Sequence, residues 1–517
     1  MPDLQTLPND LPALRSMIQT LHDALKSQNE TIEHLRHQLY LAARHRYGRK
    51  SEQVSDDQLS IFLKEIEGKA GQPPAETETI TYTRKKGHGR NPSVNDLPVY
   101  RVEHPLPEDK KTCPECQGPL SKMGEDVMRT LEHIPAVTYV REDALEKWAC
   151  PCCKGAPVTS EGPVRPLERS LAGPGILAQV VTAKFADHLP LYRQSEIFER
   201  GGLEIGRSTL CDWVGGVAGL LEPLYEAMKQ DLLGSKVIHT DDTPVPYLAD
   251  GDEAEDSGPG KAKTGRLWVY SGDVKHANIV YEFSEDRKAV HPKVFLGKWK
   301  GYLQADAYTG YDAMFKPDGA VEVACWAHAR RKFNEAKETD KKRSHEAMAY
   351  IRKLYEVEWE ADEGKMEALA RRRLREEKAA PVLKAFKQWL DAQALATLPK
   401  SPFGEALTYV FNQWDALNRY VEDGDLSIDN NEAERALRCV AIGRKNWLFA
   451  GSVTGGKRAA ILYSLVASCK RHKIDPYHYL RDVLGRVKIH PQSKIADLLP
   501  ATYKPGPAPE TPVFKQN

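Results

Sequence analysis

Residues 424–470 read GDLSIDNNEAERALRCVAIGRKNWLFAGSVTGGKRAAILYSLVASCK. The segment opens with the acidic and amide-rich triplet at 429–431, which is typical of a turn that caps a following helix. The helix-forming run that comes next carries charged side chains of both signs, Glu432, Glu434, Arg435 and Arg438. A single carboxylate here does not indicate a catalytic site unless other segments of the chain bring further carboxylates close to it.

Two upstream segments supply such partners. VIHTDDTPVPYL at 237–248 and GYLQADAYTGY at 301–311 each place an aspartate at the end of a short β-branched and aromatic run. Runs of this kind predict strands that deliver a side chain to the edge of a sheet. We therefore expect three carboxylates from distant parts of the chain to meet, those of Asp241, Asp306 and Glu434. Hard oxygen ligands suit Mg²⁺, and two such ions can support phosphoryl transfer.

Five blocks of the sequence carry a family resemblance, HTDDTPV, LQADAY, CWAHARRKF, DNNEAERALR and GRKNWLFAGS. They resemble the signature blocks of the transposases of insertion-sequence 66 type elements, which belong to the DDE group. The likeness covers nearly the whole chain, including an N-terminal zipper and a cysteine module. It implies a ribonuclease-H-like catalytic core and two small accessory proteins encoded by the same element.

The resemblance also bears on which carboxylates act. Neighbouring strand residues point to opposite faces of a sheet, so only one of Asp241 and Asp242 can reach the site. Residues 432 and 434 are about 200° apart on a helix, so only one of these glutamates can do so. Matching the family's blocks implies Asp241 and Glu434, with Glu432 as the alternative to Glu434.

Composition limits the class of protein. At 517 residues the chain is long for one domain, and its formal net charge of +0 restricts nucleic-acid binding to local basic patches. No stretch approaches the ~18–20 apolar residues of a membrane helix, and the N-terminus lacks the order of a secretion signal. We expect a bacterial cytoplasmic protein, nucleoid-associated when bound to DNA and without a membrane partner. The nine cysteines are then thiols or metal ligands rather than disulfides.

The N-terminal segment, 1–45, predicts a coiled coil. Apolar residues alternate at steps of four and three, interrupted by Gln28, along Leu14, Ile18, Leu21, Leu25, Ile32, Leu35, Leu39 and Ala42. Such a seam favours a homo-oligomer, the alternative being an amphipathic helix docked on its own protein. A basic linker follows at 46–105, and its hook of cations suits DNA phosphates, the alternative being a plain linker: Arg84, Lys85, Lys86 and Arg90.

Residues 106–165 predict a zinc-binding domain of the zinc-ribbon kind. Cys113 and Cys116 form one CxxC turn, and about 33 residues later Cys150 and Cys153 form a second. Two such turns place four thiolates around one tetrahedral Zn²⁺, which we expect to be structural. Cys152 is an alternative to either member of the second pair.

Residues 166–233 predict a helical segment. A break at Gly201-Gly202, followed by Ser208 as a helix cap, fits a DNA-binding helix-turn-helix. The alternative is a helical hairpin packed against the core. Three strands, a crossover helix, a fourth strand, a helix and a fifth strand follow at 234–335, which is the ribonuclease-H-like order. The chain then continues with a helical insertion at 336–423, a second ribonuclease-H-like core segment at 424–470, and a C-terminal helix and tail at 471–517.

Several cations near these motifs are candidates for DNA contact. They are Arg330, Arg331, Lys332, Arg435, Arg438, Arg444 and Lys445. The first three follow a Cys325–His328 pair that has two interpretations. It is half of a metal site that needs two further ligands, or a buried thiol with a histidine bonded to a neighbouring carboxylate or phosphate.

The sequence as a whole predicts a multidomain α/β DNA transposase. Water would attack the phosphodiester at the element's end, and the freed 3′-hydroxyl would then attack target DNA. One alternative is a non-catalytic DNA-binding regulator, a degenerate transposase. Another is a structure-specific nuclease with the same core, which would leave nicks instead of joined DNA.

Overall fold

The structure is a computed structural model that describes residues 138–143, 147–148, 158–159, 163–168, 170–248 and 262–506. The predicted coiled coil, basic hook and four zinc cysteines lie outside these ranges, so their predictions are untested by it. Within the predicted zinc-binding domain, β1 (Lys147–Trp148) and β2 (Val158–Thr159) pair antiparallel.

A five-stranded mixed sheet forms the centre of the fold. In the order β5-β4-β3-β6-β7, its strands are β5 (Ile279–Ser284), β4 (Ala262–Ser271), β3 (Val237–Leu248), β6 (Tyr302–Gln304) and β7 (Val321–Val323). Strands β3, β4 and β5 pair antiparallel, whereas β6 and β7 run parallel to β3. Parallel neighbours need a crossover, here α7 (Val290–Leu296) and the 3-10 helix η3 (Thr309–Met314). The strands predicted around Asp241 and Asp306 are therefore present and adjacent.

The register assigns the side chains of β3 to two faces. His239 pairs with Ser271 and Asp241 with Val269, so these residues share one face, while Thr240 shares the other with Asp242. The first face packs against α14 (Asn431–Gly443), where Tyr281 donates its hydroxyl to the Ala436 carbonyl at 2.6 Å. The opposite face packs against α7 and η3, as shown by Tyr270 stacked on Phe295 with ring centroids 3.8 Å apart.

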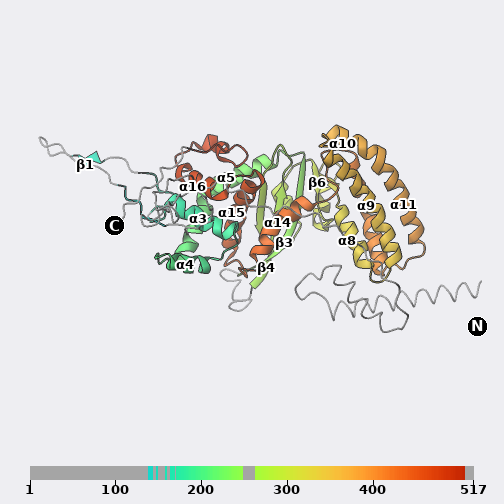
Figure 1. Ribbon diagram of the computed structural model, residues 1–517, viewed down its shortest axis with the longest axis horizontal. Coiled ribbons are helices and arrows are strands. Elements are labelled where there is room, and N and C mark those ends of the chain that lie inside the picture. Colours follow the sequence, from blue (N-terminus) through green and yellow to red (C-terminus); the bar gives the residue numbers. More distant parts are fainter. Residues whose placement is uncertain are drawn as a thin grey trace, which may run out of the picture. The chain divides into compact units, whose positions relative to one another are not determined.

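Helices that precede the strands in the sequence and helices that follow them complete this core. They are α3 (Pro174–Phe185), α4 (Leu191–Arg200), α5 (Arg207–Leu232), α15 (Val453–Arg471), α16 (Pro476–Arg486) and the 3-10 helix η6 (Gln492–Leu498). Helix α15 packs on the outer strand β5, and Figure 1 shows α15 and α5 together beside the sheet. Hydroxyls of Ser464 and Ser468 accept the backbone N–H groups of Tyr281 and Ile279 at 2.8 and 2.9 Å. The helix thereby satisfies groups that an open sheet edge would expose.

The turn between α4 and α5 corrects one prediction. Gly202 takes a φ of +83°, and α5 starts at Arg207 with Gly206 as its N-cap. Ser208 is therefore inside the helix and not its cap, because the chain leaves the extended conformation of Gly206 two residues earlier. Helix α5 buries Leu210 and further apolar residues in the core, as the alternative of a packed helical hairpin requires.

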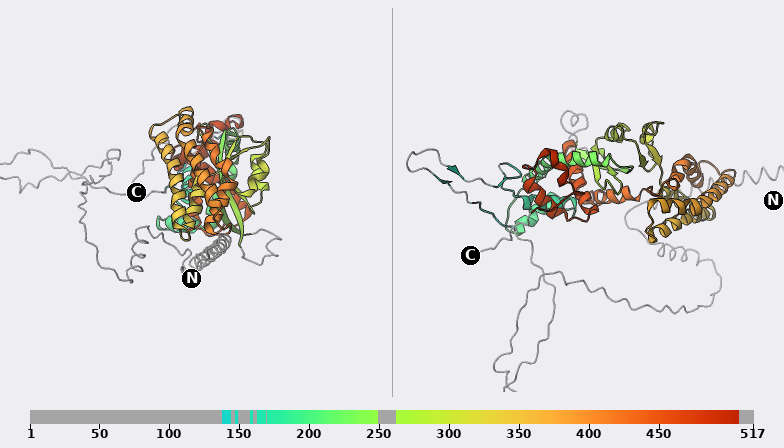
Figure 2. Two further views of the ribbon diagram at one scale, coloured as in Figure 1. Left: turned by 90° about the vertical axis from the view of Figure 1, so that its right-hand side faces the viewer. Right: turned by 90° about the horizontal axis from the view of Figure 1, so that it is seen from above.

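Helices fill the segment predicted as an insertion: α8 (Trp326–Ala336), α9 (Lys341–Glu363), α10 (Ala368–Leu374), the π-helical turn η4 (Arg375–Ala379), α11 (Ala380–Ala394), α12 (Pro402–Asn412), α13 (Trp414–Asn418) and the 3-10 turn η5 (Arg419–Val421). They share a second apolar core. Figure 2 shows the helices of this segment, in yellow and orange, gathered into one bundle, in which α9 packs against both α10 and α11. None of the helices in the described part of the chain is long and apolar enough to cross a bilayer.

Two sets of contacts tie the insertion together. Arg375 is fully buried and binds both carboxylate oxygens of Glu358 at 2.7 Å. Its remaining N–H groups donate to the carbonyls of Tyr420, Asp423 and Leu426, in the segment that leads to α14. The two ends of the insertion also lie next to each other, because the backbone N–H of Trp326 donates to the Ile428 carbonyl at 3.1 Å.

Candidate functional site

The turn at 429–431 is fastened to the sheet. Asn430 is the N-cap of α14 and is fully buried, but its side chain does not cap the helix. Instead its Nδ2 donates to the Thr240 carbonyl at 2.8 Å, and its Oδ1 accepts from His239 Nδ1 at 3.2 Å. From β6, Gln304 Nε2 donates to the Asp429 carbonyl at 3.0 Å. The first turn of α14 is therefore held beside His239 and Thr240 of β3.

This arrangement brings three predicted carboxylates into mutual range. Asp241 lies on the face of β3 that meets α14, and its Oδ1 accepts the backbone N–H of Asp242 at 2.7 Å. The pKa of Asp241 is raised from 3.8 to about 7, first by burial and then by the negative charges of Asp306, Asp242 and Glu434. The three segments singled out from the sequence thus converge on one cluster of acidic groups.

Asp306 reaches the cluster because β3 and β6 are parallel neighbours. His239 is in register with Gln304, and two residues further along lie Asp241 and Asp306 respectively. Directly after Asp306, Ala307 has a φ of +64°, a left-handed conformation that costs a residue with a side chain about 1 kcal/mol or more. The sharp turn brings the Tyr308 N–H to Asp306 Oδ1 at 3.2 Å.

Glu434 is surrounded by groups from α8. Its Oε1 lies 3.4 Å from Arg331 Nη2 and 3.7 Å from His328 Nε2. Cys325 is buried, its pKa is raised to about 11 by that burial, and its Sγ accepts the Asn430 N–H at 3.2 Å. The pair thus has the geometry of the second interpretation, a buried thiol with a histidine next to a carboxylate.

Glu432, the alternative third carboxylate, lies elsewhere. Its Oε1 is 3.0 Å from Arg471 Nη2 and accepts the Ser271 hydroxyl at 3.1 Å. The two glutamates diverge as the helical rotation between positions 432 and 434 requires. Each glutamate thus faces an arginine, Arg471 for Glu432 and Arg331 for Glu434, and Glu434 also contributes to the negative charge around Asp241.

The basic residues proposed for DNA contact have different surroundings. Arg331 lies beside Glu434, and Arg444 is half-buried and donates to the Pro244 carbonyl. The other described members of the set are exposed, namely Arg330, Lys332, Arg435, Arg438 and Lys445. Arg84, Lys85, Lys86 and Arg90 lie outside the described residues.

Two residues of the site were not assigned from the sequence. The side chain of Asp242 is 1% exposed, and it pairs with Arg266 at 3.1 Å and with Arg287 at 2.8 Å. Arg287 in turn approaches Asp306, with 3.8 Å between Nη2 and Oδ2. A buried carboxylate requires a cationic partner, so burial of Asp242 would imply a nearby cation. The sequence does not identify Arg287 as that cation, because it lies 45 residues from Asp242.

The donor atoms of the cluster fit a hard divalent cation. They are carboxylate oxygens, and the pKa of Asp241 is raised first by burial and then by neighbouring negative charges, which such a cation would neutralise. In the ranges that the structure describes, no three His, Cys, Asp or Glu side chains come close enough to hold a metal as they stand.

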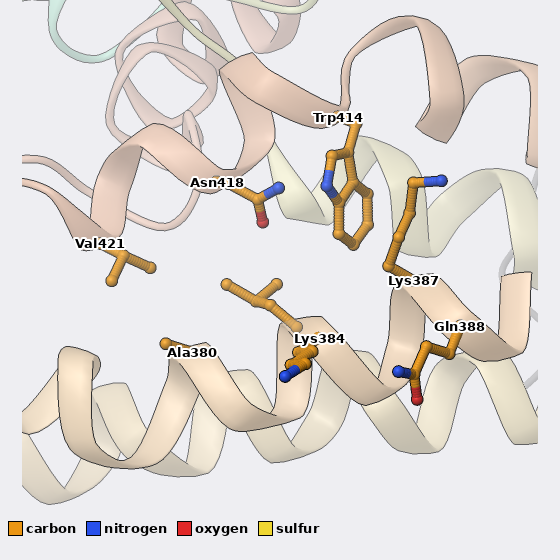
Figure 3. Close-up of a pocket in the computed structure, with 8 residues that line it drawn as sticks. Ala380, Lys384, Lys387, Gln388, Trp414, Asn418 and Val421 are labelled. Carbon is orange, nitrogen blue, oxygen red and sulfur yellow. The ribbon is translucent and has the colours of Figure 1, made fainter.

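A separate hollow lies on the insertion, between α11 and α13. Its volume is about 400 Å³ and its floor is mainly apolar, with Leu383 and Trp414 among its residues (Figure 3). Lys387 stands at its rim and lies 6.0 Å from the centre of the Trp414 ring. None of the carboxylates or cations predicted for the site lines this hollow.

Comparison with known families gives the identity of the chain. Residues 169–458, which hold all three carboxylates, match the family described as Transposase IS66 family. The chain belongs to the IS66 transposase family. Residues 464–501 match the IS66 C-terminal element, and residues 110–154 match the zinc-finger binding domain of transposase IS66. Residues 34–102 match a family described as Transposase C of IS166 homeodomain.

Relatives of this IS66-family chain occur in Sinorhizobium fredii. The uncharacterized protein y4hP is 33% identical over 490 residues, covering 88% of this chain and 86% of the relative. The uncharacterized protein y4qI is 29% identical and covers 96% of this chain and 93% of the relative. The uncharacterized protein y4jD is 32% identical over 76% of this chain and 77% of its own length.

These matches confirm the resemblance seen in the sequence blocks. The IS66 zinc-finger match covers both predicted CxxC turns, which supports zinc binding in that region of the chain. The homeodomain match covers the end of the predicted coiled coil and the basic linker with its hook. Self-association, the individual metal ligands and the domain boundaries stay predictions.

Proposed function

We propose that this IS66-family protein is a DDE transposase that cleaves DNA at the ends of its insertion element and joins them to target DNA. The observation that carries the proposal is the convergence of Asp241, Asp306 and Glu434 from three distant segments. Two other acids near the cluster lie closer to an arginine than Glu434 does, and this supports a structural role for them: Asp242 is 2.8 Å from Arg287 and Glu432 is 3.0 Å from Arg471, against 3.4 Å between Glu434 and Arg331.

The sheet supports assigning the core to the ribonuclease-H-like class. Its order, β5-β4-β3-β6-β7, combines three antiparallel strands with two parallel ones, as that class requires. In this assignment the helical insertion separates the fifth strand from α14, which carries Glu434. Fold class alone does not fix a reaction, so the proposal depends on the acidic cluster.

In the proposed mechanism Asp241, Asp306 and Glu434 hold two Mg²⁺ ions. When bound, these ions would activate the attacking water or 3′-hydroxyl and stabilise the leaving oxygen. The protein's own role is to fix the carboxylates through the strand pairing of β3 and β6 and the Asn430 contacts. Arg331 neutralises some of the charge on Glu434, and exposed cations next to the cluster attract the DNA backbone.

The remaining segments of the chain would organise the DNA complex. Cys113, Cys116, Cys150 and Cys153 would hold one structural Zn²⁺, and the basic hook would contact phosphates. The N-terminal coiled coil would join copies of the chain into a homo-oligomer that pairs two element ends. The element's small accessory proteins are further proposed partners.

The test is transposition of a marked mini-element in cells that supply this protein and its element's accessory genes. Asp241→Asn, Asp306→Asn and Glu434→Gln should each abolish joined DNA, because each removes a metal-holding charge. Glu432→Gln is the matched control and should retain joining, since Glu432 is already bound to Arg471.

Two outcomes would redirect the proposal. Loss of joining only with Glu432→Gln would transfer the third role to that residue. Wild-type protein that binds element ends without cleaving them would favour the non-catalytic regulator, and nicks without joined DNA would favour the nuclease.

A further inference from the structure

The buried carboxylate of Asp242 holds the Arg287 side chain in place. Asp242 points away from Asp241, to the opposite face of β3, and its side chain is almost completely buried. Arg287 Nε donates to Asp242 Oδ1 at 2.9 Å, and its Nη2 lies 2.8 Å from the same oxygen. Removing one member of a buried ion pair is costly, so this contact fixes the guanidinium firmly.

Tyr308 fixes the same side chain from another direction. The guanidinium carbon of Arg287 lies 4.0 Å from the centre of the Tyr308 ring, within the range of a cation–π interaction. The Tyr308 hydroxyl donates to the Arg287 carbonyl, which links the ring to the backbone of that residue. Tyr308 is also joined to Asp306 through its N–H. The arginine is therefore built into the segment that carries the second carboxylate.

The outer edge of the guanidinium has unused hydrogen-bonding capacity. Its side chain is 37% exposed, and the 3.8 Å separation of Nη2 from Asp306 is too long for a hydrogen bond. Nη1 donates to none of the described residues. A planar guanidinium with free N–H groups matches the oxygens of a phosphate. DNA entering an acidic cluster needs such a cation to offset repulsion by the carboxylates.

We propose that Arg287 binds a DNA phosphate next to the scissile bond, positioned for this contact by Asp242 and Tyr308. The inference rests on the proposed function of the carboxylate cluster. It adds a DNA-binding residue from the segment between β5 and α7, where the sequence blocks indicate none. Asp242 and Tyr308 are positioning residues in this proposal, because they act through Arg287.

The experiment is single-turnover cleavage, with Mg²⁺, of a DNA duplex that carries the element's terminal repeat. Neutral methylphosphonates replace the phosphates around the cleavage position one at a time. Wild-type protein should lose about tenfold or more in rate at one position, as expected for loss of a charged hydrogen bond. Arg287→Ala should lose a similar factor on unmodified DNA and little more when that same phosphate is neutralised.

Arg343 provides a matched control. It also pairs with an aspartate, Asp340, and lies 4.6 Å from the centre of the Phe403 ring, but it contacts none of the three carboxylates. Arg343→Ala should keep the wild-type profile of methylphosphonate effects once rates are normalised to folded protein. In a separate binding assay, Arg287→Ala should reduce the slope of log affinity against log salt by about 0.9, the value for one phosphate contact.

Three results would overturn the inference. Arg287→Ala could cleave like wild type while Asp241→Asn is inactive, which leaves the proposed function intact. It could be slow yet show the wild-type methylphosphonate penalty at every position, which would reduce Arg287 to a support for Asp306. If wild type fails to cleave, the proposed function fails, and an unchanged salt slope for Arg287→Ala then rejects the phosphate contact as well.

Discussion

In the middle of β3, the two adjacent residues Asp241 and Asp242 have different electrostatic surroundings. Burial raises the pKa of both carboxyl groups, but Asp242 has two arginine partners that oppose the rise, whereas Asp241 faces the further carboxylates of Asp306 and Glu434. Glu432 and Glu434 differ by degree, because Glu432 lies 3.0 Å from Arg471 and Glu434 lies 3.4 Å from Arg331. Of the two, Glu434 is the one whose charge helps to raise the pKa of Asp241.

The state of Asp241 gives a prediction for stability against pH. Its pKa rises from 3.8 to about 7 on folding, so between these values the folded protein keeps a proton that the unfolded chain has released. Stability should therefore fall as pH rises through this window. In the absence of divalent metal, Asp241→Asn should be more stable than wild type at pH 8, by at most on the order of 4 kcal/mol, with little gain at pH 4.

Urea unfolding of both proteins in EDTA, from pH 3 to pH 8, measures this difference. Asp286→Asn is a control of opposite sign, because hydrogen bonds from Lys288 and His291 lower the pKa of Asp286 to about 2. The Asp286→Asn variant should be less stable than wild type at neutral pH, and this difference in the free energy of unfolding should shrink as the pH falls below 4. An Asp241→Asn difference that is constant across the range would contradict the proposed charge crowding.

At the residue scale, sequence reasoning found acids but not their partners. Asp241 and Asp306 stand out in the sequence because each belongs to a β-branched and aromatic run, although β3 does not end at Asp241 but continues to Leu248. Choosing Glu434 over Glu432 required the family resemblance, since both glutamates occupy the start of one helix. Arg287 was missed because its ion pair with Asp242 joins residues 45 positions apart, and no periodicity encodes such a contact.

At the scale of elements, the start of α14 depends on one amide. Asn430→Ala would leave the Thr240 carbonyl and the His239 ring without their buried partner. We expect a loss of about 1–3 kcal/mol in the free energy of unfolding and a larger loss of transposition than stability alone explains. Asn431→Ala is the control, because Asn431 Nδ2 bonds within the turn, to Asp429. Equal effects of the two variants on transposition would contradict the positioning role.

The insertion depends on the buried Arg375–Glu358 pair in a similar way. Arg375→Met should cost about 3–5 kcal/mol, because it leaves Glu358 charged and buried without its main partner. Adding Glu358→Gln should recover some of the loss. Arg373→Met changes an exposed arginine two residues away and should stay within about 0.5 kcal/mol of wild type. Denaturant unfolding compares the variants, and additive losses would show that the two residues are uncoupled.

Elements were easier to predict than their details. Alternating β-branched and aromatic runs indicated the strands, and their order in the chain agrees with the sheet. The helix expected between the fourth and fifth strands is a 3-10 helix, and Ser208 proved not to be a cap. Burial separates Arg375 from Arg371, Arg372 and Arg373, but all four belong to one basic run in the sequence, where nothing marks which of them turns inward.

At the scale of the whole molecule, metal content tests the region of the chain that precedes the described core. The full-length protein should retain about one zinc ion per chain after dialysis, as four thiolates predict. Cys113→Ser should release it, whereas Cys211→Ser should not, because Cys211 is an exposed cysteine on α5. Elemental analysis of single Cys150, Cys152 and Cys153 variants would identify the remaining ligands. Full zinc retention by Cys113→Ser would reject the predicted site.

The way the insertion joins the sheet has a consequence for how this chain can change. Cys325, just before α8, receives the N–H of Asn430, just before α14, so about a hundred intervening residues leave and return at one point. A bundle of any size whose two ends lie side by side could occupy this place without moving either carboxylate strand. The junction is thus a place where evolution or an engineer can exchange one helical module for another while the three carboxylates keep their positions.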